Sequence, residues 1–529
     1  MKKIFMLALF VIMSVSFLAA CNEKTDKKAE ANLDNLNLDG MPIVKEEIEL
    51  KMFAPKRFAS QNWNDIKIWN EYENMTNIKV KWENVDRDNL AEKRNILLAG
   101  GDYPDVLFGN GLTVNDLMKY GKQEDFMALN DLIDQYAPNF KALLEQYPEV
   151  EKAITMPDGN IYSFPTITDP EFKAMLEGSF MWLKEEWLKE LDLEEPETTE
   201  EMYQLLKAIK ENYPDAIPMG GGPGIDAYLI PFFKGAWGLG NRGASHPYVD
   251  VDPETNELRF IPTAPRYKEM LEYLNKIYED GLIDKDFFTA NADQVIAKGS
   301  QGIYGVLPDY NPEAVYSNLT GYIGGKALKG PHGDQLYAHI GSPIGSVGQF
   351  VITKDNPNPE ATVRWVDYLY SDEGSKMFFM GFEDETYVEN EDGTLDYTDE
   401  IKNHPDGLTQ DQAVGEYLVW PGVGYPGILK QDYFKGSEGK PSSIEASEKV
   451  DPFIPEEIWP PFNYTIEELE EMNALRNDIE TYINEMNAKF ITGARSLDEW
   501  DDYVAQFDKM KLEKYMEIYN DAYERYDKQ

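Results

Sequence analysis

Side chains that could perform covalent or metal chemistry are few in this chain of 529 residues. Cys21 is the only cysteine, so the chain has one thiol nucleophile and no internal disulfide. No Gly-x-Ser-x-Gly turn, which would present a nucleophilic serine, occurs in the sequence. The histidines lack the spacing of a zinc site, and we expect them in loops or on the surface. They are His246, His332, His339 and His404.

Two motifs have part of the pattern of a ligand loop but lack residues that such loops need. Residues 220–224 are rich in glycine, yet the lysine and threonine that complete a phosphate loop do not follow. The segment that begins at Asp250 has the acidic spacing of a calcium loop, but Thr255 stands where glycine is required and Ile261 where an acid is required. We therefore predict no cofactor and no metal site, although so acidic a chain could hold a structural Ca²⁺ elsewhere.

The charge balance excludes several classes of protein. The chain has 50 basic and 96 acidic residues, a formal charge of −46, which opposes binding to nucleic acid. Charged residues make up 28% and the mean hydropathy is −0.52, so a polytopic membrane protein is excluded. Aromatic residues reach 13%, which argues against disorder. About 500 residues exceed what one hydrophobic core supports, so we expect two or more lobes.

The first residues predict export. Lys2 and Lys3 precede an apolar run that ends at Ala20, as in a signal peptide covering residues 1–20. Leu18-Ala19-Ala20-Cys21 resembles the lipobox of bacterial lipoproteins, and this resemblance implies cleavage before Cys21 and acylation of its thiol. The alternative is an ordinary signal followed by a chance cysteine. Residues 21–44 are polar and without periodicity, so we expect a flexible tether between a membrane anchor and a folded body.

The body alternates between strand and helix patterns. Residues 47–53 and 78–82 alternate as strands do, residues 105–108 form a third short strand, and helices are expected at 63–75 and 88–99. This order predicts parallel pairing with right-handed crossovers. Ligands of such sheets bind at the carboxyl ends of the strands, here the loops at 55–63 and 109–115.

Later segments show clear helix signals. Thr198 and Glu201 form a capping box, as do Thr465 and Glu468. An apolar stripe predicts a helix over residues 267–278, and a last helix is expected over residues 496–526. Residues 391–394 have the sequence of a hairpin turn.

Several segments resemble the large oligosaccharide-binding lipoproteins of ABC importers. They stand in the family's order and span about residues 45 to 526. They are Tyr103-Pro104-Asp105-Val106-Leu107, Glu186-Trp187-Leu188 with Pro196-Glu197-Thr198, residues 278–284, residues 351–368, and Lys489-Phe490-Ile491-Thr492-Gly493 with Trp500-Asp501. Lys184-Glu185-Glu186-Trp187 departs from the family's pattern, so no ligand role of an arginine is carried over there.

The resemblance implies an α/β protein with the two-lobed periplasmic-binding-protein-like fold of type II, a hinge, and extra C-terminal helices. We expect lobe one at 45–165 and 300–355, lobe two at 166–299 and 356–500, and a C-terminal helix at 501–529 that packs back across the hinge. The expected partners are an oligosaccharide or complex glycoside and an ABC permease, with no nucleic acid. The protein is expected to act as a monomer, lipid-anchored on the outer face of the cell membrane, with a Gram-positive surface favoured. No chemistry on the ligand is expected.

Sugars offer apolar C–H faces and a rim of hydroxyls, which aromatic rings and polar side chains bind together. Residues of these types that follow predicted strands or stand in glycine-flanked loops are the candidates for ligand binding. They are Trp63, Asn110, Trp237, Asp309, Tyr310 and Trp420. Other tryptophans have apolar or helical neighbours and are expected in the core, namely Trp182, Trp187, Trp365, Trp459 and Trp500.

The alternative from another class is a lipid-anchored glycoside hydrolase, which needs two carboxylates facing each other across a cleft. The abundance of acidic residues permits such a pair, but no local motif isolates one. A surface adhesin is a third alternative, and the hinged pattern argues against it.

Overall fold

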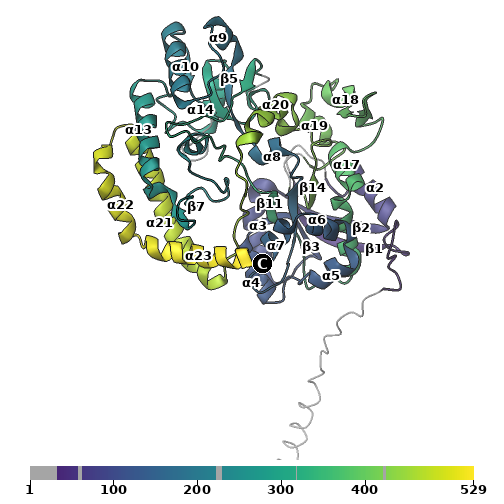
Figure 1. Ribbon diagram of the computed structural model, residues 1–529. Coiled ribbons are helices and arrows are strands. Elements are labelled where there is room, and N and C mark those ends of the chain that lie inside the picture. The colour runs from purple at the N-terminus through teal and green to yellow at the C-terminus, as the bar shows by residue number, and fades with distance from the viewer. Residues whose placement is uncertain (1–32, 57–61, 222–228, 317–318, 421–423, 529) are drawn as a thin grey trace, which may run out of the picture.

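Two β-sheets, each covered by helices, build two lobes that share one chain (Figure 1). The computed structural model describes residues 33–56, 62–221, 229–316, 319–420 and 424–528. The two-lobed α/β architecture with helices at the C-terminus agrees with the predicted fold class. Cys21 lies outside the described residues.

Lobe one is organised around a six-stranded sheet in the order β14-β4-β11-β3-β1-β2. β1 pairs in parallel with both β2 and β3, as the alternating pattern predicted, and β11 runs antiparallel between β3 and β4. The predicted hairpin is also present, as β12 and β13. The strands are β1 (Ile48–Lys56), β2 (Ile78–Asp86), β3 (Val106–Leu112), β4 (Phe164–Thr168), β11 (Ile344–Ile352), β12 (Tyr387–Glu389), β13 (Leu395–Tyr397) and β14 (Gly427–Leu429).

Helices cover this sheet, and the core between them is rich in aromatic rings. Trp69 stacks on Trp82 with ring centroids 5.0 Å apart, and Phe108 and Trp365 complete the cluster. The helices are α2 (Lys67–Thr76), α3 (Leu90–Gly100), α4 (Val114–Lys122), α5 (Asn130–Tyr136), α6 (Pro138–Gln146), α7 (Pro148–Ile154), α16 (Pro359–Asp367), α17 (Asp372–Met380), α18 (Asp399–Lys402) and α19 (Gln410–Val414).

Lobe two has a four-stranded sheet in the order β10-β5-β9-β6 and a separate hairpin of β7 and β8. The strands are β5 (Phe180–Lys184), β6 (Ile217–Met219), β7 (Val249–Val251), β8 (Leu258–Phe260), β9 (Tyr304–Asp309) and β10 (Tyr322–Gly324). The helices before the C-terminal group are α8 (Lys173–Glu177), α9 (Glu185–Glu190), α10 (Thr199–Asn212), α12 (Ile230–Lys234), α13 (Pro265–Glu279), α14 (Ala292–Gly299), α15 (Pro312–Val315) and α20 (Pro441–Val450).

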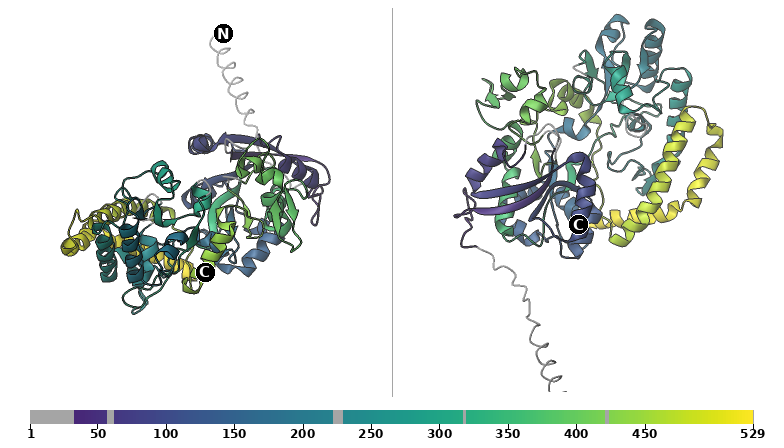
Figure 2. Two further views of the ribbon diagram at one scale, coloured as in Figure 1. Left: turned by 90° about the horizontal axis from the view of Figure 1, so that it is seen from above. Right: turned by 180° about the vertical axis from the view of Figure 1, so that it is seen from behind.

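The C-terminal helices form an arc along lobe two that ends beside lobe one (Figures 1 and 2). They are α21 (Ile466–Ile491), α22 (Trp500–Lys509) and α23 (Leu512–Lys528). The Thr465–Glu468 capping box starts α21 as predicted. The single terminal helix expected over 496–526 is wrong, because Lys511 adopts a left-handed φ of 61° and separates α22 from α23.

The lobe boundaries differ from the predicted ones. β9 pairs with β5 and β6, so residues 300–309 belong to lobe two and not to lobe one. Conversely, β14 and α16 to α19 lie in the sheet and core of lobe one, so residues 356–420 and 427–429 do not belong to lobe two. The chain passes between the sheets from β4 to α8, from β10 to β11, and from β14 to α20.

The end of the predicted tether is part of the folded body. Leu36, Ile43 and Val44 are buried against lobe one, and the Ile43 amide donates to the Thr76 carbonyl over 3.0 Å. Arg364 of α16 donates hydrogen bonds to two carbonyls of this segment. Apolar residues at spaced positions within a polar stretch gave too weak a pattern for the sequence to reveal this packing.

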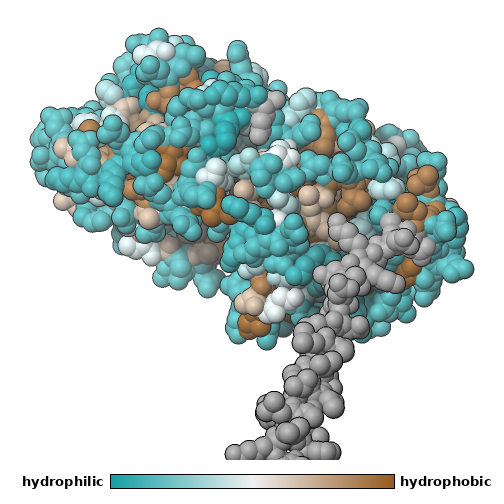
Figure 3. Space-filling view, turned by 90° about the horizontal axis from the view of Figure 1, so that it is seen from below, coloured by the Kyte–Doolittle hydropathy of each residue, from teal (hydrophilic) through white to brown (hydrophobic). Residues whose placement is uncertain are grey.

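The surface is polar over most of the face seen in Figure 3, with hydrophobic residues in small separate groups. Within the described ranges, no helix combines the length and apolar character that a membrane span requires.

Candidate functional site

A cavity of about 590 Å³ lies between the two lobes, where β3 ends and α4 begins. Its volume falls in the range of small-ligand sites. Lobe one contributes residues 113–115, and lobe two contributes the loop at residues 245–249. The segment at 461–464 and the helices α21 and α23 form the remaining wall. The predicted loop at 109–115, at the carboxyl end of β3, therefore does border a cavity.

Local contacts fix the lobe-one side of the cavity. Thr113 caps α4 by accepting a hydrogen bond from the Asp116 amide, in a reciprocal capping box. Just upstream, the Asn110 side chain donates to the carbonyls of Phe53 at 2.8 Å and Phe108 at 3.0 Å. Arg94 donates to the carbonyls of Asn110 at 2.6 Å and Gly111 at 2.9 Å. These hydrogen bonds fix the path of the turn that leads into the cavity.

One face of α21 supplies polar groups to the cavity. Leu469, Asn473, Arg476 and Glu480 recur at helical spacing, so they share this face. Arg476 Nε lies 3.9 Å from Glu480 Oε1, and both side chains remain more than one third exposed. The Arg476 guanidinium also lies 5.9 Å from the centre of the Tyr464 ring.

Aromatic side chains form much of the remaining wall. Burial raises the pKa of Tyr464 to about 12, while the charge and hydrogen bonding of Arg476 oppose this rise. Burial also raises the pKa of Tyr515, and Arg476 again acts in the opposite direction. Both hydroxyls therefore stay protonated near neutral pH. The aromatic lining consists of Tyr248, Phe462, Tyr464, Tyr515 and Tyr519.

His246 borders the cavity as a neutral side chain. Burial lowers its pKa to about 4, and its ring lies 4.3 Å from that of Phe462. Its Nε2 donates to the Pro460 carbonyl over 2.8 Å, so Nδ1 accepts from the Tyr519 hydroxyl. His246 and His339 both lie in loops, as expected, although His246 is buried and His339 is half-buried.

The described residues show no metal centre. No group of three or more His, Cys, Asp or Glu side chains in this part of the chain could hold an ion. Asp250, which starts the calcium-like segment, is buried and pairs with Arg259 at 2.7 Å, and it also accepts from the Gly240 amide. Its carboxylate oxygens therefore stabilise the β7–β8 hairpin and the loop before it, and do not bind an ion in this structure.

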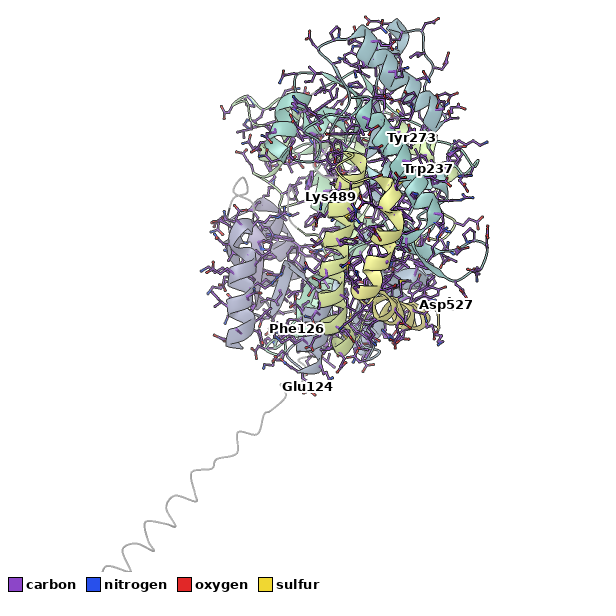
Figure 4. The ribbon with its side chains drawn as sticks, turned by 90° about the vertical axis from the view of Figure 1, so that its left-hand side faces the viewer. Glu124, Phe126, Trp237, Tyr273, Lys489 and Asp527 are labelled. Atoms are coloured by element: carbon purple, nitrogen blue, oxygen red, sulfur yellow. The ribbon has the colours of Figure 1, made fainter. Side chains whose placement is uncertain are left out.

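Two predicted ligand residues are core residues in this structure. Trp63 has no exposed surface and meets Trp82 edge to face, with centroids 4.9 Å apart. Trp237 is buried in lobe two against Tyr273, with centroids 5.4 Å apart (Figure 4). Each large ring fills space between packed elements in this structure, and a ligand role for either ring stays a prediction.

The other predicted residues lie away from the lining of this cavity. Asn110 is buried and does not line the cavity. Asp309, at the end of β9, accepts from the Tyr310 amide at 2.7 Å and from the Tyr316 hydroxyl, and Tyr310 itself is 42% exposed. Trp420 is half-buried and donates from Nε1 to the Tyr397 hydroxyl over 3.2 Å. A ligand role for these four residues stays a prediction.

Most of the tryptophans that were predicted to lie in the core are buried. Trp182, Trp365, Trp459 and Trp500 are buried, as expected, whereas Trp187 is half-buried and stacks on Tyr213 with centroids 4.4 Å apart.

The sequence did not predict the residues of α21 and α23 that line the cavity. Arg476 and Glu480, four residues apart, have the pattern of an ordinary surface ion pair.

Known proteins similar to this chain point to one family. The fructooligosaccharide ABC transporter substrate-binding protein FusA of Streptococcus pneumoniae is 29% identical, over 98% of this chain and 97% of its own. The lipoprotein LipO of Bacillus subtilis is 24% identical over 84% of this chain and 86% of its own. The structure of FusA in complex with kestose matches 91% of this chain and 99% of its own, with 27% identity and a TM-score of 0.73.

The family model agrees with these similarities. The model described as bacterial extracellular solute-binding protein matches residues 63–376, more than half of the chain. A solute-binding family supports the binding interpretation over the glycoside hydrolase that the sequence left open. The chain belongs to the family of bacterial extracellular solute-binding proteins.

Proposed function

We propose that the protein captures an oligosaccharide outside the cytoplasmic membrane and delivers it unchanged to an ABC permease. The observation that carries this proposal is the cavity between the lobes, where aromatic rings stand beside Asn473, Arg476 and Glu480. Rings match the C–H faces of sugars, and the polar side chains match their hydroxyls. The similarity to FusA supports the same ligand class and makes fructooligosaccharides the first sugars to test.

The two-lobed architecture suits a binding protein that closes on its ligand. Residues from both lobes line the cavity, so a sugar would contact both and stabilise the closed arrangement. Closure then presents a different surface to the permease from that of the empty protein. The protein acts as a monomer in this scheme.

The predicted N-terminal processing places this function at the membrane. Acylation of Cys21 would anchor the chain on the extracytoplasmic face, and a Gram-positive cell surface fits best. The similarity to a lipoprotein of Bacillus subtilis supports this placement. Radiolabelled palmitate incorporation into the wild type, and its loss in Cys21→Ser, tests it.

Hydrolysis of the ligand is disfavoured by the cavity's composition. A glycosidase needs two facing carboxylates. Among the described residues that line the cavity, Glu480 is the only acidic one, and Arg476 lies beside it.

A thermal-shift screen tests the proposal. Kestose, nystose, raffinose, maltotriose, xylotriose and trigalacturonate are added in turn to the purified protein. A ligand at 100 times its Kd stabilises the folded protein by about 2.7 kcal/mol, which raises Tm by several degrees. Chromatography of the sugar afterwards checks that it is intact. Absence of any shift across the panel, or cleavage of a bound sugar, contradicts the proposal.

A further inference from the structure

The charges at the cavity are balanced within a single pair. Arg476 and Glu480 are the only formally charged residues among the described ones that line it. His246, which also borders the cavity, is neutral near pH 7, since burial lowers its pKa to about 4. The site therefore has one cation and one anion, one helical turn apart on α21.

The position of Arg476 is held from several sides. Glu480 Oε1 lies 3.9 Å from its Nε, and the Tyr464 ring centre lies 5.9 Å from the guanidinium carbon. Its charge and hydrogen bonding also act on Tyr515, across from α21 on α23. A guanidinium has five N–H donors, so it can keep these contacts and still donate to a ligand hydroxyl.

We infer that Glu480 sets the charge specificity of the site, so that the cavity takes uncharged oligosaccharides and rejects those that contain uronate. This inference rests on the proposed function. An uncharged sugar can use both members of the pair, because its hydroxyls accept from Arg476 and donate to Glu480. A uronate carboxylate must instead compete with Glu480 for the one guanidinium, and the two anions repel each other. Specificity then comes from a repulsive element as much as from an attractive one.

Removal of this anion, with the shape of the side chain kept, tests the inference. Glu480→Gln should leave Arg476 uncompensated and open to a carboxylate. Glu470→Gln is the matched control, because it makes the same charge change on an exposed part of α21 that does not line the cavity. Glu480→Asp keeps the charge and should keep the selectivity.

Binding of kestose, raffinose, maltotriose, xylotriose and trigalacturonate to these full-length proteins is measured by calorimetry at one ionic strength. We expect the wild type to bind its best neutral sugar at least tenfold more tightly than trigalacturonate. We expect Glu480→Gln to shift the ratio of the two Kd values at least tenfold toward trigalacturonate, and Glu470→Gln to shift it less than twofold. Equal melting temperatures of the two glutamine variants confirm that both are folded.

The contrary results separate failure of the charge inference from failure of the proposed function. If the wild type prefers trigalacturonate, the charge inference is overturned while oligosaccharide binding stands. The same holds if Glu480→Gln leaves the ratio of Kd values unchanged. If the wild type binds no sugar of the panel, the proposed function and the inference both fail.

Discussion

Asn463, which precedes α21, donates its side-chain amide to the Ala153 carbonyl at the end of α7 over 2.8 Å. The same amide donates to the Thr155 carbonyl over 2.9 Å. α7 belongs to lobe one and α21 packs with lobe two, so one amide joins the lobes directly. Arg525 of α23 pairs with Glu468 and donates to the Asn463 carbonyl, which ties the C-terminal helices to this joint.

Asn463→Ala should therefore destabilise the contact between the lobes. Two partly buried carbonyls lose their donor, so we expect the free energy of unfolding to fall by about 1–3 kcal/mol. Urea denaturation followed by circular dichroism measures it. Asn477→Ala, on an exposed part of α21, is the control and should change stability by less than about 0.5 kcal/mol. An equal loss in both variants contradicts a special role of Asn463.

Arg476→Gln should weaken binding of an uncharged sugar. The variant removes charged donors from the cavity and leaves Glu480 without its partner, so we expect Kd to rise about tenfold, equivalent to about 1.4 kcal/mol. Calorimetry against the best neutral sugar of the panel measures the change. Arg495→Gln, on a residue beyond the end of α21 that does not line the cavity, is the control. Undiminished affinity in Arg476→Gln would remove this residue from the site.

Acid should destabilise the protein through His246. Burial lowers its pKa from 6.5 to about 4 in the folded protein. Between these values the unfolded chain binds a proton that the folded chain does not, so stability falls as the pH drops from 6.5 to 4. The loss contributed by this residue approaches about 3 kcal/mol.

His246→Gln removes that contribution. The difference in unfolding free energy between pH 7 and pH 4.5 should shrink relative to the wild type, although the variant is less stable at pH 7. A pH dependence that is the same in both proteins contradicts the assignment.

Glu177 should make the protein less stable as the pH rises, whereas His246 makes it less stable as the pH falls. Burial raises the pKa of this carboxyl to about 8; the charge of Asp451 adds to the rise and the charge of Lys173 opposes it. From pH 4.5 to 8 the folded chain holds a proton that the unfolded chain has lost, so stability falls as the pH rises through this range. Glu177→Gln, a neutral isostere, should be more stable than the wild type at pH 8 by up to about 4 kcal/mol and similar to it at pH 5. Melting temperatures at the two pH values measure this, and a variant that is less stable at pH 8 contradicts it.

The sequence predicted those elements that depend on near neighbours. The Thr198–Glu201 and Thr465–Glu468 capping boxes begin α10 and α21, and the alternating patterns became β1 and β2. It did not predict which sheet each strand joins. β9 enters lobe two and β14 enters lobe one through pairings between residues far apart in the chain, which no local pattern encodes.

The candidate site was predicted only as a region. The loop after β3 does border a cavity, because parallel strands place their carboxyl ends at one edge of a sheet. Trp63 and Trp237 were predicted as ligand residues because they stand in predicted loops, yet both rings are packed in the core of this structure. The sequence did not identify Arg476 and Glu480 as site residues. Two opposite charges four residues apart on a helix have the same spacing whether they face solvent or a cavity between lobes.

Because Leu36, Ile43 and Val44 are buried in the folded body, they shorten the segment that could serve as a tether to the membrane. If the lipid is at Cys21, residues 22–32 are all that separate it from the first described residue, Leu33. At about 3.5 Å per residue, eleven residues reach roughly 40 Å at full extension. With a lipid at Cys21, so short a tether would keep the protein at a high effective concentration around nearby permeases, and delivery would depend little on long diffusion along the cell surface.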